Sequence, residues 1–364
     1  MGTLFIILFF LIALYGFFIL WITIGCFKIE WFRSTFESPK HTFSIVVPFR
    51  NENHTLPTLL SSFSKLNYPK ELFEVILVDD DSFQPFLIHN TPFSIKVIQN
   101  ERQSASPKKD AIRTAIRNSK FDWIITTDAD CEVPENWLLV LDNYIQKQPK
   151  ARMVCGMVFS KITNDFLGRF ELLDFASLQS ATIGTFGIGR PLMCNGANFA
   201  YQKDFFEELN GFVGNDNIAS GDDVFLLQKA IKKQPNNIFY LRSNDFTVVT
   251  HPVLGWKGMF LQRVRWASKT KAYQNSFAKV LAFVVLFGNL GFILSVLGLL
   301  WDLSFLILIL FKLLVDFVLL LQSKKTNPIF YVLSGFIYPF FSFAVGVYVF
   351  INKKYIWKDR VVYN

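Results

Sequence analysis

The run WIITTDAD, residues 123–130, decides the fold class of this chain. Its first five residues are aromatic or β-branched, the types that favour a buried strand, and two aspartates follow where that strand must end. A second apolar run, residues 74–78, likewise ends at the acidic triplet 79–81. Between these runs Pro107 opens a segment with apolar residues at helical spacing. Short strands alternating with helices predict an α/β fold with a parallel sheet, in which ligands bind at the carboxyl ends of the strands.

The same patterns predict the other elements of this globular part. The expected strands are residues 43–47, 74–78, 95–98 and 123–126, and the expected helices are residues 56–66, a segment beginning at Ser106, 224–231 and 256–272. Pro48 is expected to end the first strand, because proline cannot donate a hydrogen bond to a sheet.

Apolar segments flank this part of the chain. Three charge-free runs are long enough to cross ~30 Å of hydrocarbon as helices at about 1.5 Å per residue: residues 3–27, 280–301 and 328–351. A fourth run, residues 303–322, is similar but carries Lys312 and Asp316. A charge inside a bilayer is costly unless it is paired, so these two are expected to form an i, i+4 ion pair; contact with a polar lipid head is the alternative.

The charges around these segments predict an orientation. The first run is expected to be a retained anchor rather than a cleaved signal peptide, since it has no basic start and no cleavage site. Lys28, Arg33 and Lys40 follow it directly, which predicts a cytoplasmic globular domain on a multi-pass protein of the cell membrane. The basic tail, residues 353–364, conflicts with three full crossings after that domain. Pro339 is therefore expected to break the last run into a re-entrant hairpin.

The expected domain organisation has five parts: an N-terminal anchor at 1–30, a catalytic domain at 41–250, an interfacial amphipathic helix at 251–275, membrane segments at 278–352 and a basic tail at 353–364. The formal net charge of +8 collects near the membrane segments, which indicates contact with anionic lipid heads rather than with nucleic acid. The four cysteines have no C-x-x-C spacing and are expected to be reduced.

Two acidic clusters lie at predicted strand ends. Asp128 and Asp130 suit a hard divalent cation such as Mg²⁺, which takes one or two carboxylates together with substrate phosphates; a solvated turn is the alternative. Asp79, Asp80 and Asp81 favour a turn as well, but three adjacent carboxylates repel each other, so a role with a cation or a nucleobase is expected.

Two further clusters sit at predicted helix starts. Lys108 and Lys109 oppose the helix dipole unless an anion binds there, so they are candidate phosphate contacts, with solvent exposure as the alternative. Asp222 and Asp223 offer a carboxylate that takes a proton from an attacking hydroxyl, although one of them is also expected to cap the helix.

A last cluster comes just before the C-terminal membrane segments. Gln262, Arg265 and Trp266 lie in a stretch whose pattern is also that of an interfacial amphipathic helix. The functional interpretation places them at the acceptor and diphosphate end of a site, with Trp266 as a flat face for a sugar ring.

In this order, the clusters resemble the inverting glycosyltransferases of family 2, which have the GT-A fold. The resemblance covers roughly residues 41–270, and the layout is similar to the ceramide glucosyltransferase-like and polysaccharide-synthase-like branch. Its parts are Ile45–Pro48 with Asn51 and Glu52, Val78–Ser82, Lys108–Ala111, Asp128–Asp130, Gly221–Asp223 and the Q-x-x-R-W-like Gln262–Trp266.

The resemblance implies a role for each matching position. The nucleoside positions are matched by Pro48, Glu52, Asp79 and Asp80, a nucleotide contact by Asp128, and a diphosphate contact by Lys108 or Lys109. The Mg²⁺ or Mn²⁺ ligand is matched by Asp130, and the catalytic base by Asp223, with Asp222 the less favoured choice. The acceptor side is matched by Gln262, Arg265 and Trp266. Asp81 and Asp222 depart from the usual Gly and Glu, which leaves open the acting aspartate of each cluster.

The implied reaction is a single inverting displacement that moves a sugar from a nucleotide-sugar, expected to be a UDP-sugar, to a lipid or membrane-linked glycan. A processive polysaccharide synthase is an alternative, although only three membrane segments follow the domain. A non-catalytic sugar-nucleotide-binding scaffold is another, against which the complete acidic set argues.

Overall fold

The computed structural model describes residues 2–35, 37–88, 90–218, 220–273, 275–323, 328–352, 354–357 and 360–363. By contacts the chain divides into two compact units. We call residues 30–159 and 192–251 the sheet unit, and residues 1–29, 160–191 and 252–364 the helical unit. The predicted catalytic domain, 41–250, included residues 160–191, which join the helical unit.

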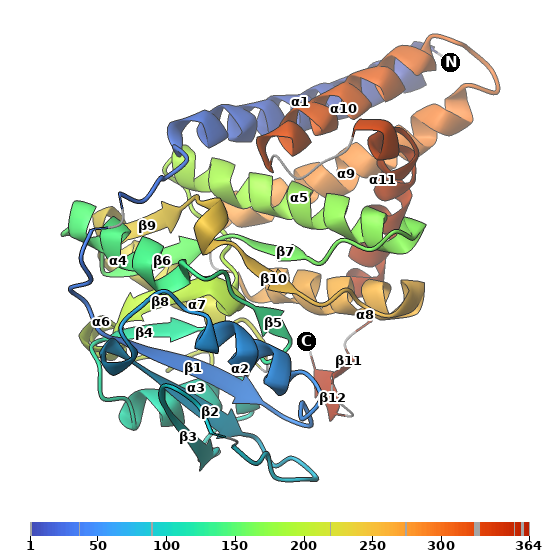
Figure 1. Cartoon of the computed structure of the whole chain (residues 1–364). Helices are drawn as coiled ribbons and strands as arrows, with labels where there is room; N and C mark the ends of the chain where they lie inside the picture. The colour runs from blue at the N-terminus through green and yellow to red at the C-terminus, as the bar shows by residue number, and fades with distance from the viewer. Residues whose placement is uncertain are drawn as a thin grey trace. The chain divides into compact units, whose positions relative to one another are not determined.

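The sheet unit is built on seven strands in the order β3-β2-β1-β4-β8-β6-β9 (Figure 1). In chain order they are β1 (Phe43–Phe49), β2 (Phe73–Asp79), β3 (Ser94–Gln99), β4 (Trp123–Thr126), β6 (Met153–Gly156), β8 (Phe199–Gln202) and β9 (Ile238–Leu241). The strands β3, β2, β1 and β4 are mutually parallel, whereas β8 is antiparallel to both β4 and β6. The predicted parallel α/β core is therefore confirmed, with a mixed second half.

The helices of this unit are α2 (Leu56–Ser64), α3 (Pro107–Arg117), α4 (Trp137–Lys147), α6 (Lys203–Glu208) and α7 (Asp222–Lys233). A second, three-stranded sheet has the order β5-β10-β7, formed by β5 (Cys131–Glu132), β10 (Val248–Thr250) and β7 (Val158–Ser160). Every residue of β2 and β4 is buried, as expected for parallel strands covered on both faces.

The first strand does not end where the sequence predicted. It continues through Pro48 to Phe49 and pairs there with β2. Its pairing with β4 stops at Val46, so beyond that residue β1 has a neighbour on one side only. A missing N–H on the unpaired side leaves the ladder intact, which is why Pro48 is tolerated.

The helical unit contains α1 (Gly2–Lys28), α5 (Phe166–Gly187), α8 (Gly255–Ser268), α9 (Ser276–Gly298), α10 (Phe305–Leu320) and α11 (Pro328–Ile351), with a terminal hairpin of β11 (Lys354–Trp357) and β12 (Arg360–Tyr363). Helix α1 packs against α5, α9 and α10 (Figure 1). A Cβ on Gly25 would lie 2.1 Å from the carbonyl oxygen of Gly184, so glycine is required where α1 crosses α5.

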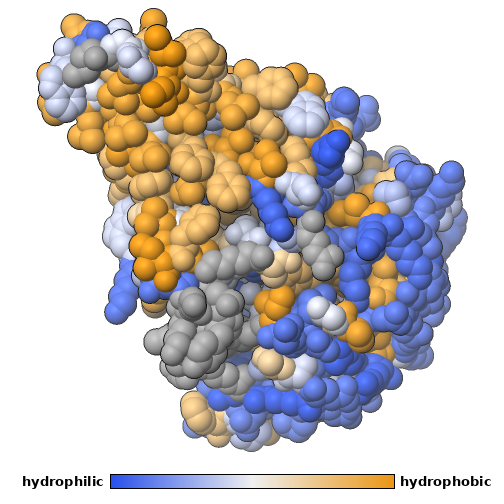
Figure 2. Space-filling model, turned by 180° about the vertical axis from the view of Figure 1, so that it is seen from behind, coloured by the Kyte–Doolittle hydropathy of each residue, from blue (hydrophilic) through white to orange (hydrophobic). Residues whose placement is uncertain are grey.

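Four helices in the described part of the chain are long and apolar enough to cross a membrane: Gly2–Lys28, Ser276–Gly298, Phe305–Ser323 and Phe330–Ile351. Figure 2 shows apolar side chains gathered over the helical unit, whereas the sheet unit is largely hydrophilic on this face. The predicted ion pair is confirmed, since Lys312 Nζ lies 2.8 Å from Asp316 Oδ2.

The predicted re-entrant hairpin is wrong. Helix α11 runs without interruption from Pro328 to Ile351, with Pro339 inside it. Proline removes one backbone hydrogen bond, but neighbouring helices in a membrane bundle tolerate such a position without a break. The basic tail in part lies outside the described residues.

Candidate active site

Asp79 and Asp80 lie where β2 ends and are both buried. Asp79 Oδ1 accepts a hydrogen bond from Ser82 N at 3.0 Å, which closes the turn after the strand. The Asp80 carboxylate accepts from Asn100 Nδ2 at 2.7 Å and from Arg102 Nε at 2.8 Å. The two predicted nucleoside positions therefore differ: Asp79 shapes the loop, whereas Asp80 belongs to a polar cluster.

The loop after β1 is tied to the loop after β2. Asn51 has a left-handed φ of 56°, and its side-chain oxygen accepts from Phe83 N at 2.9 Å. Asn51 N in turn donates to Ser82 Oγ at 2.9 Å. Glu52 Oε2 accepts from Thr55 Oγ1 at 2.9 Å beside the start of α2. These contacts hold the predicted nucleoside side of the site at the carboxyl ends of adjacent parallel strands.

Lys108 lies among the predicted catalytic carboxylates. Its Nζ is 2.7 Å from Asp128 Oδ1 and 3.4 Å from Asp222 Oδ2. Burial disfavours the charged ammonium, but the charges of Asp128 and Asp222 outweigh this and raise the pKa of Lys108 above its ordinary value. The side chain is therefore a permanent cation at neutral pH.

The start of α7 is set by Gly221, whose φ of 84° favours a residue without a Cβ. Asp222 and Asp223 then fall in the first turn, where the helix dipole stabilises negative charge. Asp223 Oδ2 accepts from Gly196 N at 3.2 Å, and a Cβ on Gly196 would lie 2.9 Å from Asp222 Oδ2. The backbone at Gly196 thus closes one side of this acidic cluster.

Lys109 has a different place from its neighbour. It is fully buried, and its Nζ donates to the carbonyl oxygens of Asn215 and Ile218 at 2.6 and 2.9 Å. Its ammonium also lies 5.1 Å from the ring centroid of Phe225 in α7. Of the two lysines that the sequence could not separate, Lys108 is the one that faces the carboxylates, and Lys109 holds the loop before α7.

Asp130 immediately precedes β5, which pairs with β10. This pairing brings His251 next to Asp130: His251 N donates to the Asp130 carbonyl oxygen at 3.2 Å, and Thr250 Oγ1 lies 3.4 Å from Asp130 Oδ2. Burial, then the charges of Asp130 and Asp128, raises the pKa of the Cys131 thiol. Cys131 is therefore a neutral thiol at physiological pH, which makes it a poor metal ligand.

Sequence reasoning missed His251, which lies well outside every acidic motif. The Asp130 carboxylate is an oxygen ligand of the kind that Mg²⁺ or Mn²⁺ takes together with substrate phosphates, whereas His251 contacts Asp130 through its backbone N–H. Among the described residues, no group of three or more His, Cys, Asp or Glu side chains is arranged to hold a metal ion. The role of Asp130 as a metal ligand therefore stays a prediction.

The helical unit carries Gln262, Arg265 and Trp266 on α8. The apolar face of this helix includes Val264, which packs with Val345 and Val349 of α11. Arg263, which no prediction included, is the buried arginine of the motif.

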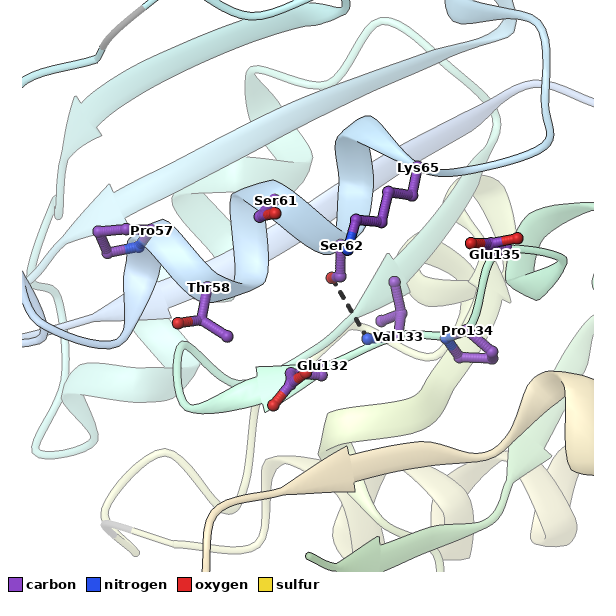
Figure 3. Close-up of a pocket in the computed structure, with 9 residues that line it drawn as sticks. All are labelled: Pro57, Thr58, Ser61, Ser62, Lys65, Glu132, Val133, Pro134 and Glu135. Atoms are coloured by element: carbon purple, nitrogen blue, oxygen red, sulfur yellow. Dashed lines mark hydrogen bonds between the residues drawn. The ribbon is translucent and has the colours of Figure 1, made fainter.

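A groove of about 510 Å³ lies between α2 and the segment after Asp130 (Figure 3). Ser62 Oγ accepts from Val133 N at 3.3 Å beneath it. It is lined by Pro57, Thr58, Ser61, Ser62, Lys65, Glu132, Val133, Pro134 and Glu135. None of the predicted site residues lines this groove.

The comparisons with known proteins concern the family and the fold. Residues 44–209 match the family model described as glycosyl transferase family 2. The chain is 27% identical over 249 residues to the probable glycosyltransferase YdaM of Bacillus subtilis, covering 65% of this chain and 57% of the relative. It is 22% identical over 235 residues to the poly-beta-1,6-N-acetyl-D-glucosamine synthase of Staphylococcus epidermidis, covering 62% and 53%. The chain thus spans little more than half the length of these relatives.

Among solved structures, the mannosyltransferase PcManGT from Pyrobaculum calidifontis, in complex with GDP-Man and Mn²⁺, has a TM-score of 0.59 and 15% identity. The match covers 96% of this chain and 97% of that chain. At this identity the likeness concerns the fold alone. The mixed sheet and these comparisons together show a GT-A fold, and residues 44–209, a little under half of the chain, match the model of glycosyl transferase family 2.

Proposed function

We propose that this protein is a membrane-bound glycosyltransferase that moves a sugar from a UDP-sugar to a lipid or membrane-linked glycan, with inversion at the anomeric carbon. The observation that carries the proposal is the single cluster of Lys108, Asp128, Asp222 and Asp223 at the carboxyl ends of the strands. One site thus contains a cation that can stabilise the charge of a departing diphosphate and carboxylates that can accept a proton from the acceptor hydroxyl.

The donor binds along the ends of β1, β2 and β4. Glu52, Asp79 and Asp80 lie on the nucleoside side, with Pro48 at the end of the first of these strands. Lys108 donates to the diphosphate in exchange for its contacts with Asp128 and Asp222, and its permanent positive charge stabilises the negative charge that develops on the leaving group.

Asp130 would hold the divalent cation, expected to be Mg²⁺ or Mn²⁺. When bound, such an ion neutralises charge on the leaving diphosphate as a Lewis acid. The Mn²⁺ in the structure of PcManGT supports this assignment of cofactor class.

Asp223 acts as the general base. As the acceptor hydroxyl attacks the anomeric carbon, its proton passes to the Asp223 carboxylate, and the bond to the diphosphate breaks. Gly196 N, 3.2 Å from Asp223 Oδ2, holds the carboxylate in position. Asp222 is the alternative base, but its contact with Lys108 favours a role in holding that cation.

Gln262, Arg265 and Trp266 of the helical unit bind the acceptor and the diphosphate end. Four candidate membrane helices support a multi-pass protein, and the basic residues after the first of them support a cytoplasmic catalytic domain. A processive synthase is the second candidate, favoured by the similarity to the poly-beta-1,6-N-acetyl-D-glucosamine synthase.

The test uses the full chain in lipid nanodiscs, with a total membrane lipid extract as acceptor and a panel of UDP-sugars and GDP-mannose as donors. We expect release of UDP from one donor only when Mg²⁺ or Mn²⁺ is present, and release about 100- to 10,000-fold slower from an Asp223→Asn variant. The product of an α-linked donor should have a β-linkage by NMR, and its size separates one transfer from many. Folded protein that releases no nucleotide from any donor would overturn the proposal.

A further inference from the structure

Arg263 lies between the Gln and the Arg-Trp pair of the α8 motif and contacts two of its members. Its Nη1 donates to Gln262 Oε1, and its guanidinium carbon lies 4.3 Å from the ring centroid of Trp266. The guanidinium carbon is also 5.1 Å from the ring centroid of Phe175 in α5. The side chain is 5% exposed, so these contacts are made away from solvent.

Two acidic residues of α5 hold this guanidinium. Arg263 Nε donates to Asp174 Oδ2 at 2.5 Å, and its Nη2 lies 3.9 Å from Glu171 Oε1. Both carboxylates are buried. An arginine with two counter-charges and two adjacent rings against it has little freedom to turn, so whatever it contacts is fixed with it.

The contact with Gln262 decides which end of that amide a ligand meets. A guanidinium carries only donors, so the amide oxygen must face Arg263 and the NH₂ group is directed away from it. Gln262 therefore presents hydrogen-bond donors. Its partner in a substrate must be an oxygen that accepts, such as a sugar hydroxyl or a phosphate oxygen.

The contacts with Trp266 fix its ring. One face of the indole lies against the guanidinium, and its edge meets Phe175 at a centroid distance of 5.6 Å and an interplanar angle of 85°. Trp266 is nevertheless only half-buried, so part of the ring still meets solvent. Arg263 thus supports one face of the Trp266 ring, and the accessible part of the ring can stack against a ligand.

We propose that Arg263 is a positioning residue for the acceptor side: held by Asp174 and Glu171, it orients the Gln262 amide and the Trp266 ring for an oxygen-rich, sugar-like group. This rests on the proposed function, because it presumes that Gln262 and Trp266 serve the acceptor. It adds the residue through which α5, remote in sequence from the motif, governs that side of the reaction.

The experiment compares Arg263→Lys and the double variant Arg263→Met/Asp174→Asn with the wild type. The lysine variant keeps the charge but loses the planar contact with Trp266, and the double variant keeps the net charge of the cluster. Arg169→Met is the matched control, because Arg169 also lies on α5 and stacks on a ring, Phe330 at 3.7 Å, but touches no motif residue.

Rates are measured with UDP-N-acetylglucosamine, or the donor that the panel identifies, and the membrane lipid extract. Misplacement of a substrate contact by about 1 Å costs about 100-fold, so we expect that loss in acceptor kcat/KM for the double variant and about tenfold for Arg263→Lys. The donor KM and the rate of donor hydrolysis without acceptor should stay within about twofold, as for Arg169→Met. Equal losses on both substrates, or a wild-type acceptor kcat/KM in Arg263→Lys, would overturn the proposal.

A second readout does not depend on turnover. In protein labelled with 5-fluorotryptophan, the ¹⁹F signal of Trp266 is assigned with Trp266→Phe. We expect Arg263→Lys to shift and broaden this signal and Arg169→Met to leave it in place. An unmoved signal in Arg263→Lys refutes the positioning role, whereas a moved signal in a protein without transferase activity refutes the proposed function alone.

Discussion

The Lys108→Met substitution tests the centre of the candidate site, because it removes a cation that contacts both Asp128 and Asp222. Its Nζ is 2.7 Å from the first carboxylate and 3.4 Å from the second, and the Lys108 side chain is 22% exposed. Removing one partner of a buried ion pair lowers the free energy of unfolding by about 3–5 kcal/mol. Because Asp128 is 36% exposed, solvent screens part of this, and we expect a loss of roughly 2–3 kcal/mol.

For a unit of this size such a loss lowers Tm by roughly 4–12 °C. Donor turnover should fall as well, since a hydrogen bond to a charged group contributes about 1.5–3 kcal/mol, or roughly 10- to 100-fold in donor kcat/KM. Melting curves and donor kcat/KM are measured on the full chain in nanodiscs. Lys120→Met, at an exposed lysine of the same unit, is the matched control and should change neither quantity.

The double variant Lys108→Met/Asp222→Asn separates the two effects. Removing one of the uncompensated carboxylates should restore most of the lost Tm, whereas donor kcat/KM should stay low because the cation is still absent. Wild-type Tm and donor kcat/KM in Lys108→Met, or a double variant no more stable than the single one, would refute the reasoning.

Three further predictions follow from the same geometry. Asp223→Asn should lower turnover by about 100- to 10,000-fold while donor affinity, measured by equilibrium binding, stays nearly intact; an unchanged turnover removes Asp223 from the role of base. Asp130→Ala should abolish the dependence of donor binding on Mn²⁺, and calorimetry that still shows this dependence would place the metal elsewhere. Burial raises the pKa of Glu171 above its unfolded value of about 4.3, and Arg263 only partly offsets this. Between the unfolded and the folded pKa of Glu171 the folded state binds more protons than the unfolded state, so the wild-type Tm should fall as pH rises through that window. The Tm of Glu171→Gln should not show this fall. Parallel Tm profiles of the two proteins would contradict the prediction.

The sequence was sufficient for the four parallel strands β3, β2, β1 and β4, but not for β8, β6 and β9 of the same sheet. The run at residues 123–126 became β4 with the predicted bounds, because aromatic and β-branched residues followed by aspartates fit few other structures. The clusters at Asp80 and Asp128 lie at strand ends for the same reason. The site residues from β2, α3, β4 and α7 belong to one unit, although their roles remain predictions.

The sequence could not separate Lys108 from Lys109. Successive residues of a helix point about 100° apart, so one faces the carboxylates and the other enters the core. Which is which depends on how α3 is rotated against the sheet, a property of packing between distant segments. The buried carbonyls of Asn215 and Ile218, which hold Lys109, are likewise beyond any local pattern.

Two other residues show the same limit. His251 is brought beside Asp130 by strand pairing across a long stretch of chain, so no local spacing could reveal it. Pro339 was interpreted from its local cost and from the charge of the basic tail, whereas α11 packs against α8 and α9 and continues through it. In both cases tertiary contacts decided what the sequence pattern left open.

A crystal structure of the full chain with UDP and Mn²⁺ is the most direct test of the central claim. We expect the diphosphate to contact Lys108 Nζ, with Mn²⁺ bridging a phosphate oxygen and Asp130, and Asp223 near the place of the attacking hydroxyl. UDP bound away from the ends of β2 and β4, with Lys108 still paired to Asp128 and Asp222, would contradict the account.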